Sequence, residues 1–317
     1  MRVLAAAEID EVLDFPGLIE ALREAFRSDV ETPLRHHHTI ARPDADATLL
    51  LMPAWTGPSV AAGGHVGVKV VSVFPANGGK GLPSVMGAYL LLCGETGRPL
   101  AVMDGQALTL WRTAAASALA ASCVAAPGAS RMLMVGTGAL APYLVAAHRA
   151  VRPITDVAVW GRDTAKAEAL AARLRADGIA AAAVADLEPA ARAADIISCA
   201  TLSKSPLVMG DWLKPGAHLD LVGAFRPDMR ESDDAAVSRA SIFVDTRAGA
   251  LTEGGDLADP LARGIIGADA VRADLFDLVA GRHAGRGDAG EITLFKSVGT
   301  AIEDLAAARL VWSRLAG

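Results

Sequence analysis

The stretch Met132-Leu133-Met134-Val135-Gly136-Thr137-Gly138-Ala139-Leu140-Ala141 decides the fold that we expect for this chain. Four apolar residues lead into a GxGxxA turn, and helical spacing continues from the turn to His148. The next apolar strand, Asp156–Trp160, follows at the interval that a βαβ unit requires. The alternative is a glycine-rich turn that binds no ligand. Such a turn does not require the preceding strand, the following helix and the second strand that are all present here. The stretch therefore predicts a parallel-sheet domain of the Rossmann type with a dinucleotide at the turn.

The residue types in the turn suit the phosphates of a dinucleotide. Gly136 allows the tight turn, and Gly138 lets the backbone approach a pyrophosphate. The small side chain of Ala141 allows close packing of the helix, whose N-terminal N–H groups can bind the anion. These features predict a phosphate-binding turn.

The end of the second strand bears on the choice between NAD and NADP. NAD recognition usually places an acidic side chain there, whereas NADP requires a cation. The run Gly161-Arg162-Asp163 offers both. Arg162 can pair with a 2′-phosphate and stack on adenine, while Asp163 can cap the next helix or reach a ribose hydroxyl. We therefore expect NADPH, with NADH possible.

Regular elements extend on both sides of this unit. Strands are expected to alternate with helices after Arg131, as in a parallel sheet. Before it, the chain predicts a helix, then strands that pair antiparallel across the turn Gly94–Gly97, then an Ala-rich helix that ends at Pro127-Gly128. The elements expected are a helix at Ile9–Ser28, strands at His65–Phe74, Tyr89–Cys93 and Pro99–Met103, a helix at Gln106–Ala125, strands at Asp195–Ala200, His218–Gly223, Ser241–Asp245 and Ile292–Phe295, and a helix at Val298–Leu315.

This order of elements predicts an α/β protein with two domains. The Rossmann-type parallel-sheet domain, which binds NAD(P), is expected over 113–299. An α+β domain for substrate binding and dimerisation is expected over 1–112, completed by 300–317. A chain of 317 residues has room for both.

The composition argues against several classes of partner. The formal net charge of −6 disfavours nucleic acid and anionic membrane, because both attract a basic surface. At the N-terminus acidic residues follow a short apolar stretch, so we do not expect a signal peptide, and we expect apolar stretches such as Ala114–Pro127 to be interrupted or too short to cross a membrane. The three cysteines show no metal-binding or disulfide spacing, and we expect reduced, mostly buried thiols. We expect a cytoplasmic protein.

Two cations interrupt apolar segments and are candidates for binding an anion. Arg112 lies at the start of an Ala-rich helix, where an unpaired charge would be costly, so we expect either a ligand or a buried partner for it. Lys69 interrupts an apolar strand, although a strand lysine can also protect a sheet edge. The run His36-His37-His38 is not expected to bind a metal, because neighbouring strand residues alternate faces and no acidic or cysteine partner follows.

Several separated motifs resemble the ornithine cyclodeaminase/mu-crystallin family. The resemblance covers the chain from Lys69 to the end and is looser before it, where Arg35 and Met52-Pro53-Ala54 match. The motifs are Gly67-Val68-Lys69-Val70-Val71, Met103-Asp104-Gly105, Arg112-Thr113-Ala114-Ala115, the GxGxxA turn, Lys214-Pro215-Gly216-Ala217-His218, Gly223-Ala224-Phe225-Arg226-Pro227-Asp228-Met229-Arg230-Glu231 and Leu294-Phe295-Lys296-Ser297-Val298-Gly299.

The resemblance implies a homodimer whose α+β domain faces the Rossmann domain across a cleft. It implies that Lys69, Arg112 and Arg35 bind the carboxylate of a small imino or amino acid, and we expect Lys69 also to assist proton delivery. The residues expected to bind the cofactor, on the fold and the resemblance together, are Arg112, Thr113, Gly136, Gly138, Ala139, Leu140, Gly161, Arg162, Asp163, Thr201, Leu202, Val222, Gly223, Ser297, Val298 and Gly299.

The segment after Gly223 distinguishes the branches of the family. Cyclodeaminases resemble GGDxPGKxEL, and the reductase and crystallin branch resembles GAxRPDxREL, whereas this chain has GAFRPDMRES. Phe225 stands where cyclodeaminases have a carboxylate, and Asp228 suits a turn or a helix cap. We therefore expect reduction of a cyclic ketimine, Δ1-pyrroline-2-carboxylate or Δ1-piperideine-2-carboxylate, to L-proline or L-pipecolate. Ornithine cyclodeaminase, an alanine-type dehydrogenase and a non-catalytic, crystallin-like binder of NADPH are the alternatives.

Overall fold

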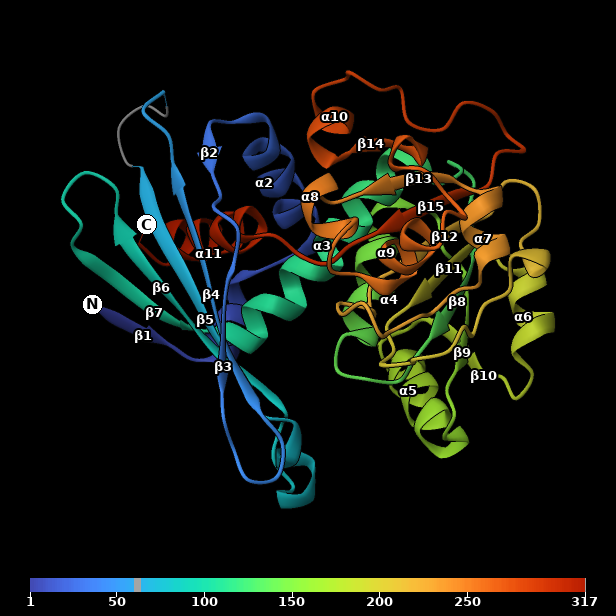
Figure 1. The fold of residues 1–317 in the computed structure, drawn as a ribbon, viewed down its shortest axis with the longest axis horizontal. Coiled ribbons are helices and arrows are strands. Elements are labelled where there is room, and N and C mark those ends of the chain that lie inside the picture. Colours follow the sequence, from blue (N-terminus) through green and yellow to red (C-terminus); the bar gives the residue numbers. More distant parts are fainter. Residues whose placement is uncertain (60–63, 317) are drawn as a thin grey trace. The chain divides into compact units, whose positions relative to one another are not determined.

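The structure, a computed structural model, describes residues 1–59 and 64–316. It divides into two compact units (Figure 1). Unit 1 comprises Met1–Thr113 and Thr300–Gly317, and unit 2 comprises Ala114–Gly299. This division lies one residue from the domain boundary expected from the sequence. The roles of the units in substrate binding and dimerisation stay predictions.

Unit 1 is built on one mixed sheet with the strand order β1-β7-β6-β5-β4-β2, and β3 also pairs with β4. The expected hairpin is confirmed, since β6 and β7 pair antiparallel, while β1 pairs parallel with β7. The strands are β1 (Arg2–Leu4), β2 (Val30–Glu31), β3 (His36–Ile40), β4 (Ala47–Thr56), β5 (His65–Val73), β6 (Val85–Cys93) and β7 (Pro99–Asp104), with the short 3₁₀ helix η1 (Pro75–Lys80) between β5 and β6.

The helix expected at Ile9–Ser28 is wrong as a single element. The chain forms α1 (Ala6–Val12) and α2 (Phe15–Arg27), separated at Leu13-Asp14. Asp14 is extended and its side chain accepts a hydrogen bond from the Gly17 N–H, which caps α2. Pro16 stands in the first turn of α2, where its missing N–H costs nothing. A new helix therefore starts where helical periodicity alone suggested continuity.

The two faces of the unit 1 sheet differ. The helix α11 (Ala301–Ala316) packs against β4, β5 and β6, although it comes from the other end of the chain (Figure 1). Met52, Lys69 and Tyr89 are register partners on these strands, and all three are buried. The alternate positions of β5 point to the opposite face, where Val66 and Val68 are half-buried and Val70 is exposed.

The long helix α3 (Gly105–Val124) is apolar enough and long enough to cross a membrane, the one such helix among the described residues. The expectation that the apolar segments are too short was therefore wrong for this helix. Of its most apolar window, 72% is buried inside the protein, as is typical of a core helix. The boundary between the two units falls within α3, at Thr113 and Ala114.

Unit 2 is a doubly wound α/β domain, which confirms the expected fold class. Its eight-stranded sheet is parallel throughout, in the order β10-β9-β8-β11-β12-β15-β13-β14. The strands are β8 (Arg131–Val135), β9 (Asp156–Trp160), β10 (Ala180–Ala183), β11 (Ile196–Cys199), β12 (His218–Leu221), β13 (Ser241–Val244), β14 (Val271–Asp274) and β15 (Thr293–Lys296). The sequence did not indicate β10, since four alanines carry no strand signal.

Helices connect these strands, as expected for crossovers in a parallel sheet. They are α4 (Ala141–Val151), α5 (Thr164–Ala176), α6 (Leu187–Ala193), α7 (Asp234–Arg239), α8 (Arg247–Ala250), α9 (Gly255–Ala262) and α10 (Leu275–Val279), with the 3₁₀ helices η2 (Gly210–Trp212) and η3 (Ala268–Ala270). The buried residues of β8, β11, β12 and β15 form the centre of the core of this unit. The loops that follow the carboxyl ends of these four strands contain predicted cofactor residues.

The last helix begins at Ala301 and not at Val298, which corrects the expected boundary. The backbone N–H groups of Val298 and Gly299 both donate to the buried carboxylate of Asp245, at 2.8 and 2.7 Å. Gly299 has a φ of 81°, which favours glycine and interrupts a right-handed helix. Asp245 therefore holds Ser297–Gly299 as a loop.

Candidate active site

Lys69 occupies the middle of the unit 1 sheet. Its strand β5 lies between β4 and β6, so the alternative of a lysine that protects a sheet edge does not apply. Only 2% of Lys69 is exposed. Its ammonium group lies 2.9 and 2.8 Å from the two carboxylate oxygens of Asp304, which α11 contributes. A strand and a helix from opposite ends of the chain thus hold one buried ion pair.

Arg112 on α3 meets the same helix. Its guanidinium lies 2.6 Å from Glu303 Oε2 through Nη1 and 3.0 Å from Asp304 Oδ1 through Nε. Both acids are fully buried, and Arg112 is 6% exposed. The structure therefore brings Lys69 and Arg112 together around adjacent carboxylates, as the need for a buried partner suggested. The sequence analysis missed Glu303 and Asp304, although two adjacent acids in the apolar first half of a helix were a visible signal.

The surroundings of Lys69 lower the pKa of its ammonium group to about 8. Burial is the largest cause, followed by the positive charge of Arg112, and the Asp304 carboxylate opposes both. Arg35, the third predicted cation, also lowers this pKa, which places its charge within electrostatic reach of Lys69. A lysine with a pKa near 8 exchanges a proton readily close to neutral pH.

Tyr89 adds a buried hydroxyl to this group of residues. It is the register partner of Lys69 on β6, and burial and the Asp304 charge raise its pKa well above the usual value, so it stays a neutral donor. Its hydroxyl has no hydrogen-bond partner within residues 1–59 and 64–316. A buried donor without a partner is costly, which fits a ligand that satisfies it.

Gly67 makes room for this hydroxyl. A Cβ atom at position 67 would lie 1.9 Å from Tyr89 Oη, a separation that no side chain tolerates. A glycine is therefore needed at position 67, because the Tyr89 side chain approaches the backbone closely there.

The glycine-rich turn of unit 2 opens into a pocket of about 620 Å³. Seven residues expected to bind the cofactor line this pocket. They are Gly136, Gly138, Gly161, Arg162, Asp163, Thr201 and Leu202. The turn, the end of β9 and the end of β11 thus form one site.

The two glycines of the GxGxxA turn have the conformation and the open space that a phosphate-binding turn requires. Gly136 has a φ of 118°, and a Cβ there would lie 2.5 Å from the Ala200 carbonyl oxygen. A Cβ at Gly138 would meet nothing within 4 Å, so this backbone is open to a ligand. The residues present fit the pyrophosphate of a dinucleotide, which could approach the chain at Gly138.

Asp163 is engaged at the start of α5. Its side chain accepts hydrogen bonds from the N–H groups of Ala165 and Lys166, at 3.0 and 3.2 Å, so it caps this helix. Arg162 and Lys166 are exposed and line the same pocket. Of the two roles considered for Asp163, the structure shows the helix cap. The cations Arg162 and Lys166 line the pocket together with Asp163.

Glu231 organises the loops that follow β11 and β12. Its buried carboxylate accepts hydrogen bonds from Thr201 N–H and Oγ1, at 2.7 and 2.8 Å, and from Gly223 N–H, at 2.7 Å. Burial and the nearby Asp256 raise the Glu231 pKa to about 7. Thr201 and Gly223 are both predicted cofactor residues, so one acid holds two parts of the site. The sequence analysis quoted Glu231 within a motif and gave it no role.

A second buried pair supports Glu231 and the end of β15. The Asp256 carboxylate accepts from the Glu231 N–H at 2.7 Å and from the Lys296 ammonium group at 3.1 Å. Lys296 and Asp256 are both fully buried. Ser297, Val298 and Gly299 follow Lys296 and are held by Asp245. These predicted cofactor residues belong to unit 2 but do not line the pocket.

Other predicted residues lie outside the pocket as well. Ala139 and Leu140 precede α4, and Val222 and Gly223 follow β12. Arg112 and Thr113 belong to unit 1, whereas the glycine-rich turn belongs to unit 2.

The segment after Gly223 is a turn and not a helix cap. Asp228 pairs with Arg226 at 2.9 Å and with Lys204 at 3.0 Å near the surface, which agrees with a structural role. Phe225 is 40% exposed, an unusual position for a large apolar side chain.

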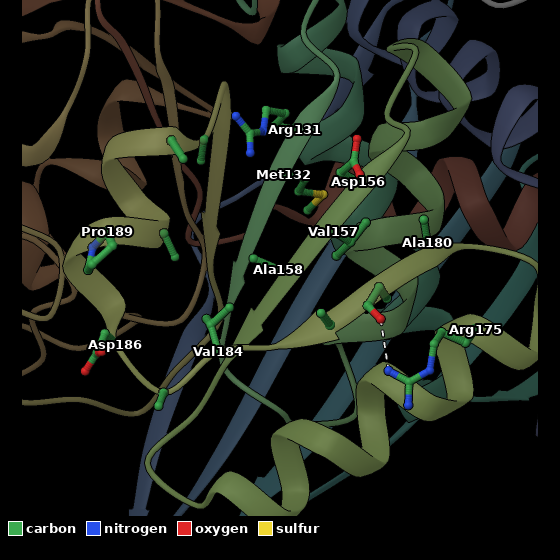
Figure 2. A pocket seen from close by; sticks show the side chains of 16 residues that line it. Arg131, Met132, Asp156, Val157, Ala158, Arg175, Ala180, Val184, Asp186 and Pro189 are labelled. Carbon is green, nitrogen blue, oxygen red and sulfur yellow. Dashed lines mark hydrogen bonds between the residues drawn. The ribbon is translucent and has the colours of Figure 1, made fainter.

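A second groove of unit 2, of about 800 Å³, lies elsewhere. Figure 2 shows Met132, Val157 and Val184 on its floor, with Pro189 of α6 at one side. Arg175 also lines the groove, but it donates to the Ala181 carbonyl. None of the predicted site residues lines this groove, and we assign it no role.

The described residues contain no group of three or more His, Cys, Asp or Glu side chains placed to hold a metal ion. The three cysteines are free, but only Cys199 is buried, while Cys93 and Cys123 are half-buried. The expectation of mostly buried thiols was therefore wrong for two of them.

Comparison with known proteins identifies the family of this chain. The pattern of the ornithine cyclodeaminase/mu-crystallin family matches residues 1–317. The chain belongs to this family. The Δ1-pyrroline-2-carboxylate reductase of Paracoccus denitrificans is 42% identical over 301 residues, which cover 93% of this chain and 94% of the relative.

Two solved structures of family members are similar over the whole chain. The Δ1-pyrroline-2-carboxylate reductase of Thermococcus litoralis, in complex with NADH and L-proline, has a TM-score of 0.92 at 33% identity and covers 100% of this chain and 98% of its own. An archaeal alanine dehydrogenase dimer with bound NAD has a TM-score of 0.90 at 31% identity, with coverages of 100% and 96%. This family member is thus related to NAD(P)-dependent oxidoreductases.

Proposed function

We propose that this protein reduces a cyclic ketimine, Δ1-pyrroline-2-carboxylate or Δ1-piperideine-2-carboxylate, to L-proline or L-pipecolate. The observation that carries the proposal is the buried group of Lys69, Arg112 and Tyr89 around Asp304 and Glu303. Two cations and an unsatisfied hydroxyl suit a small carboxylate with a polar ring atom. Similarity to two Δ1-pyrroline-2-carboxylate reductases supports the same substrate class.

Each residue has a distinct role in this proposal. Arg112 binds the substrate carboxylate, and its charge is partly balanced by Glu303. Lys69 binds the same carboxylate and, with a pKa of about 8, donates a proton to the imine nitrogen near neutral pH. The dinucleotide, when bound, supplies the hydride that is added to the imine carbon. The protein then acts mainly by orienting the substrate and excluding water from it.

The chain lacks a group that ornithine cyclisation would need. Phe225 stands at the position of the cyclodeaminase carboxylate, and a phenyl ring cannot accept a proton. The neighbouring Asp228 is engaged by Arg226 and Lys204. Reduction of a preformed cyclic imine makes no such demand, which favours the reductase.

We also propose that NADPH is the preferred cofactor. Arg162 and Lys166 line the pocket, and both can bind a 2′-phosphate. Asp163, the acid that could bind a ribose hydroxyl instead, caps α5. NADH stays an alternative, because two solved relatives carry NADH or NAD.

We propose a homodimer formed through the sheet face of unit 1 that points away from α11. Its side chains are apolar and half-buried to exposed, including Leu51, Val68, Val70 and Leu90. An apolar face of this kind on a single chain is typical of a protein interface. The alanine dehydrogenase relative is a dimer, which supports the proposal.

The test is an assay of reduced nicotinamide consumption with the purified protein. We expect rapid oxidation of NADPH with Δ1-pyrroline-2-carboxylate or its six-membered homologue, and little with pyruvate plus ammonia or with ornithine. Turnover with pyruvate and ammonia alone would favour an alanine-type dehydrogenase. Tight NADPH binding without turnover of any substrate would favour a crystallin-like binding protein.

A further inference from the structure

Unit 1 contains a second pocket that the proposed reaction does not use. It encloses about 370 Å³ between α2 and α11, next to the start of β5. The residues that line it are Ala21, Glu24, Ala25, Ser28, His65, Ala306, Arg309, Leu310, Trp312 and Ser313. None of them belongs to the predicted substrate or cofactor sites.

Arg309 gives this pocket its charge. Its guanidinium is half-buried and makes no hydrogen bond or ion pair with any residue of 1–59 or 64–316. Burial lowers the pKa of Arg309, and no acidic side chain counteracts the shift. Arginine nevertheless stays ionised. An arginine removed from water without an anion is costly, so an anionic ligand would relieve the cost.

His65, at the start of β5, supplies a second polar group to the lining of this pocket. Its Nδ1 is buried and has no hydrogen-bond partner in the described chain. Burial and the positive charge of Arg309 lower the pKa of His65, so its imidazole is neutral at neutral pH. Among the described residues, Glu24 of α2 lines the same pocket, and Cys93 is the register partner of His65 on β6.

The remaining walls determine what kind of anion fits. Ala25, Ala306, Leu310 and Trp312 form apolar walls, which suit a hydrocarbon body. Glu24 lies at the exposed rim and pairs with Arg27 at 3.5 Å. An acid at the rim disfavours ligands with several negative charges, such as inorganic phosphate.

We propose that this pocket binds a small apolar monocarboxylate through Arg309 and His65. The carboxylate pairs with the Arg309 guanidinium and accepts a hydrogen bond from His65, and the apolar body packs against Trp312. Because the bound anion stabilises the charged imidazole, binding draws a proton onto His65, and affinity falls as the pH rises.

The two residues proposed to bind the carboxylate lie on the same strand and the same helix as the buried ion pair of the candidate active site. His65 and Lys69 lie on one face of β5, and Arg309 and Asp304 lie on the same helix α11. A ligand between β5 and α11 therefore touches the two elements that hold the buried ion pair. The proposal for this pocket does not depend on the proposed reaction, so either one can be wrong while the other is right.

The experiment is isothermal titration of the full-length protein with benzoate, in two buffers that differ in ionisation enthalpy. We expect a saturable binding event whose heat depends on the buffer, which reports uptake of a proton. Inorganic phosphate should bind much more weakly. Arg309→Met should weaken benzoate binding about tenfold or more, as expected for loss of a charge-assisted pair. His65→Gln should abolish the proton uptake.

Arg98→Met is the matched control, because it removes one exposed arginine of the same unit and should leave binding unchanged. Circular dichroism and thermal unfolding show whether Arg309→Met remains folded. Benzoate binding to Arg309→Met with wild-type affinity would overturn the proposal, since the event would then lie elsewhere. Equal affinity for phosphate and benzoate would overturn the choice of an apolar monocarboxylate. A changed oligomeric state of Arg309→Met without altered binding would assign Arg309 to an interface.

Discussion

The ammonium group of Lys69 lies 2.8 Å from the Asp304 carboxylate, and both side chains are buried. Burial of two charges costs desolvation free energy that their attraction does not always recover. A pair retained in the middle of a sheet is therefore better explained by function than by stability.

Lys69→Ala should lower kcat for the cyclic imine by about 100-fold, because it removes both a carboxylate ligand and a proton donor. In the wild-type protein the donor is protonated below its pKa of about 8, so kcat/KM should fall as the pH rises above this value. Steady-state kinetics across pH measure both effects. Lys80→Ala, an exposed lysine on η1, is the control. An unchanged kcat in Lys69→Ala would contradict the role in proton transfer.

Asp304→Asn should lower the free energy of unfolding by about 3–5 kcal/mol, because two buried cations lose a shared carboxylate. Urea denaturation measures this change. Adding Lys69→Met should recover part of the loss, since one of the uncompensated charges is then removed. Glu11→Gln, an exposed acid on α1, should have little effect. Additive losses in the double variant would show that the two residues do not interact.

Glu231→Gln should raise the dissociation constant for NADPH about tenfold, because an amide cannot accept from Thr201 and Gly223 at once. The ionised acid satisfies these donors, and its pKa is about 7. Wild-type affinity should therefore decline as the pH falls below about 7, and this decline should be absent from the variant. Fluorescence titration with NADPH measures both. An identical pH dependence in the two proteins would rule out Glu231 as its source.

Arg162→Ala should lower kcat/KM for NADPH about tenfold and leave kcat/KM for NADH unchanged, since only NADPH carries the 2′-phosphate. The comparison uses both cofactors at a saturating imine concentration. Arg173→Ala, an arginine near the end of α5, is the control. Equal losses with the two cofactors would mean that Arg162 does not contact the 2′-phosphate.

Val70→Glu should raise the dissociation constant of the dimer about 100-fold or more, because an ionised carboxylate resists removal from water. Sedimentation velocity measures the change. Val3→Glu, at an exposed apolar residue of β1, is a control outside the centre of the face. A dimer that survives Val70→Glu unchanged would place the interface elsewhere.

The fold could be predicted largely from local patterns. The Gly136-Thr137-Gly138 turn and its flanking strand predicted the parallel sheet because each requirement of the βαβ unit is local in sequence. The predicted helix boundaries were wrong where a distant side chain or a capping residue determines the start of the helix. Asp245 keeps Val298 out of α11, and Asp14 starts α2 in mid-pattern. The four alanines of β10 form a strand only because β9 pairs with them.

The candidate site was predicted in part. Lys69 and Arg112 were recognisable because a charge in an apolar segment needs a partner. Their partners, Glu303 and Asp304, were not identified, because periodicity does not say which strand a C-terminal helix will cover. Glu231 and Asp256 act through backbone N–H groups of residues that only the fold brings near.

The origin of the buried carboxylates in α11 also bears on how the protein is made. Ribosomes release a chain from its N-terminus, and domains commonly fold as they emerge. Lys69 and Arg112 are synthesised long before Glu303 and Asp304, so the sheet of unit 1 must wait for the final helix before its inner charges are neutralised. Unit 2 has its whole sequence available earlier. Unit 1, most of which is synthesised first, is therefore the later of the two units to reach its native state.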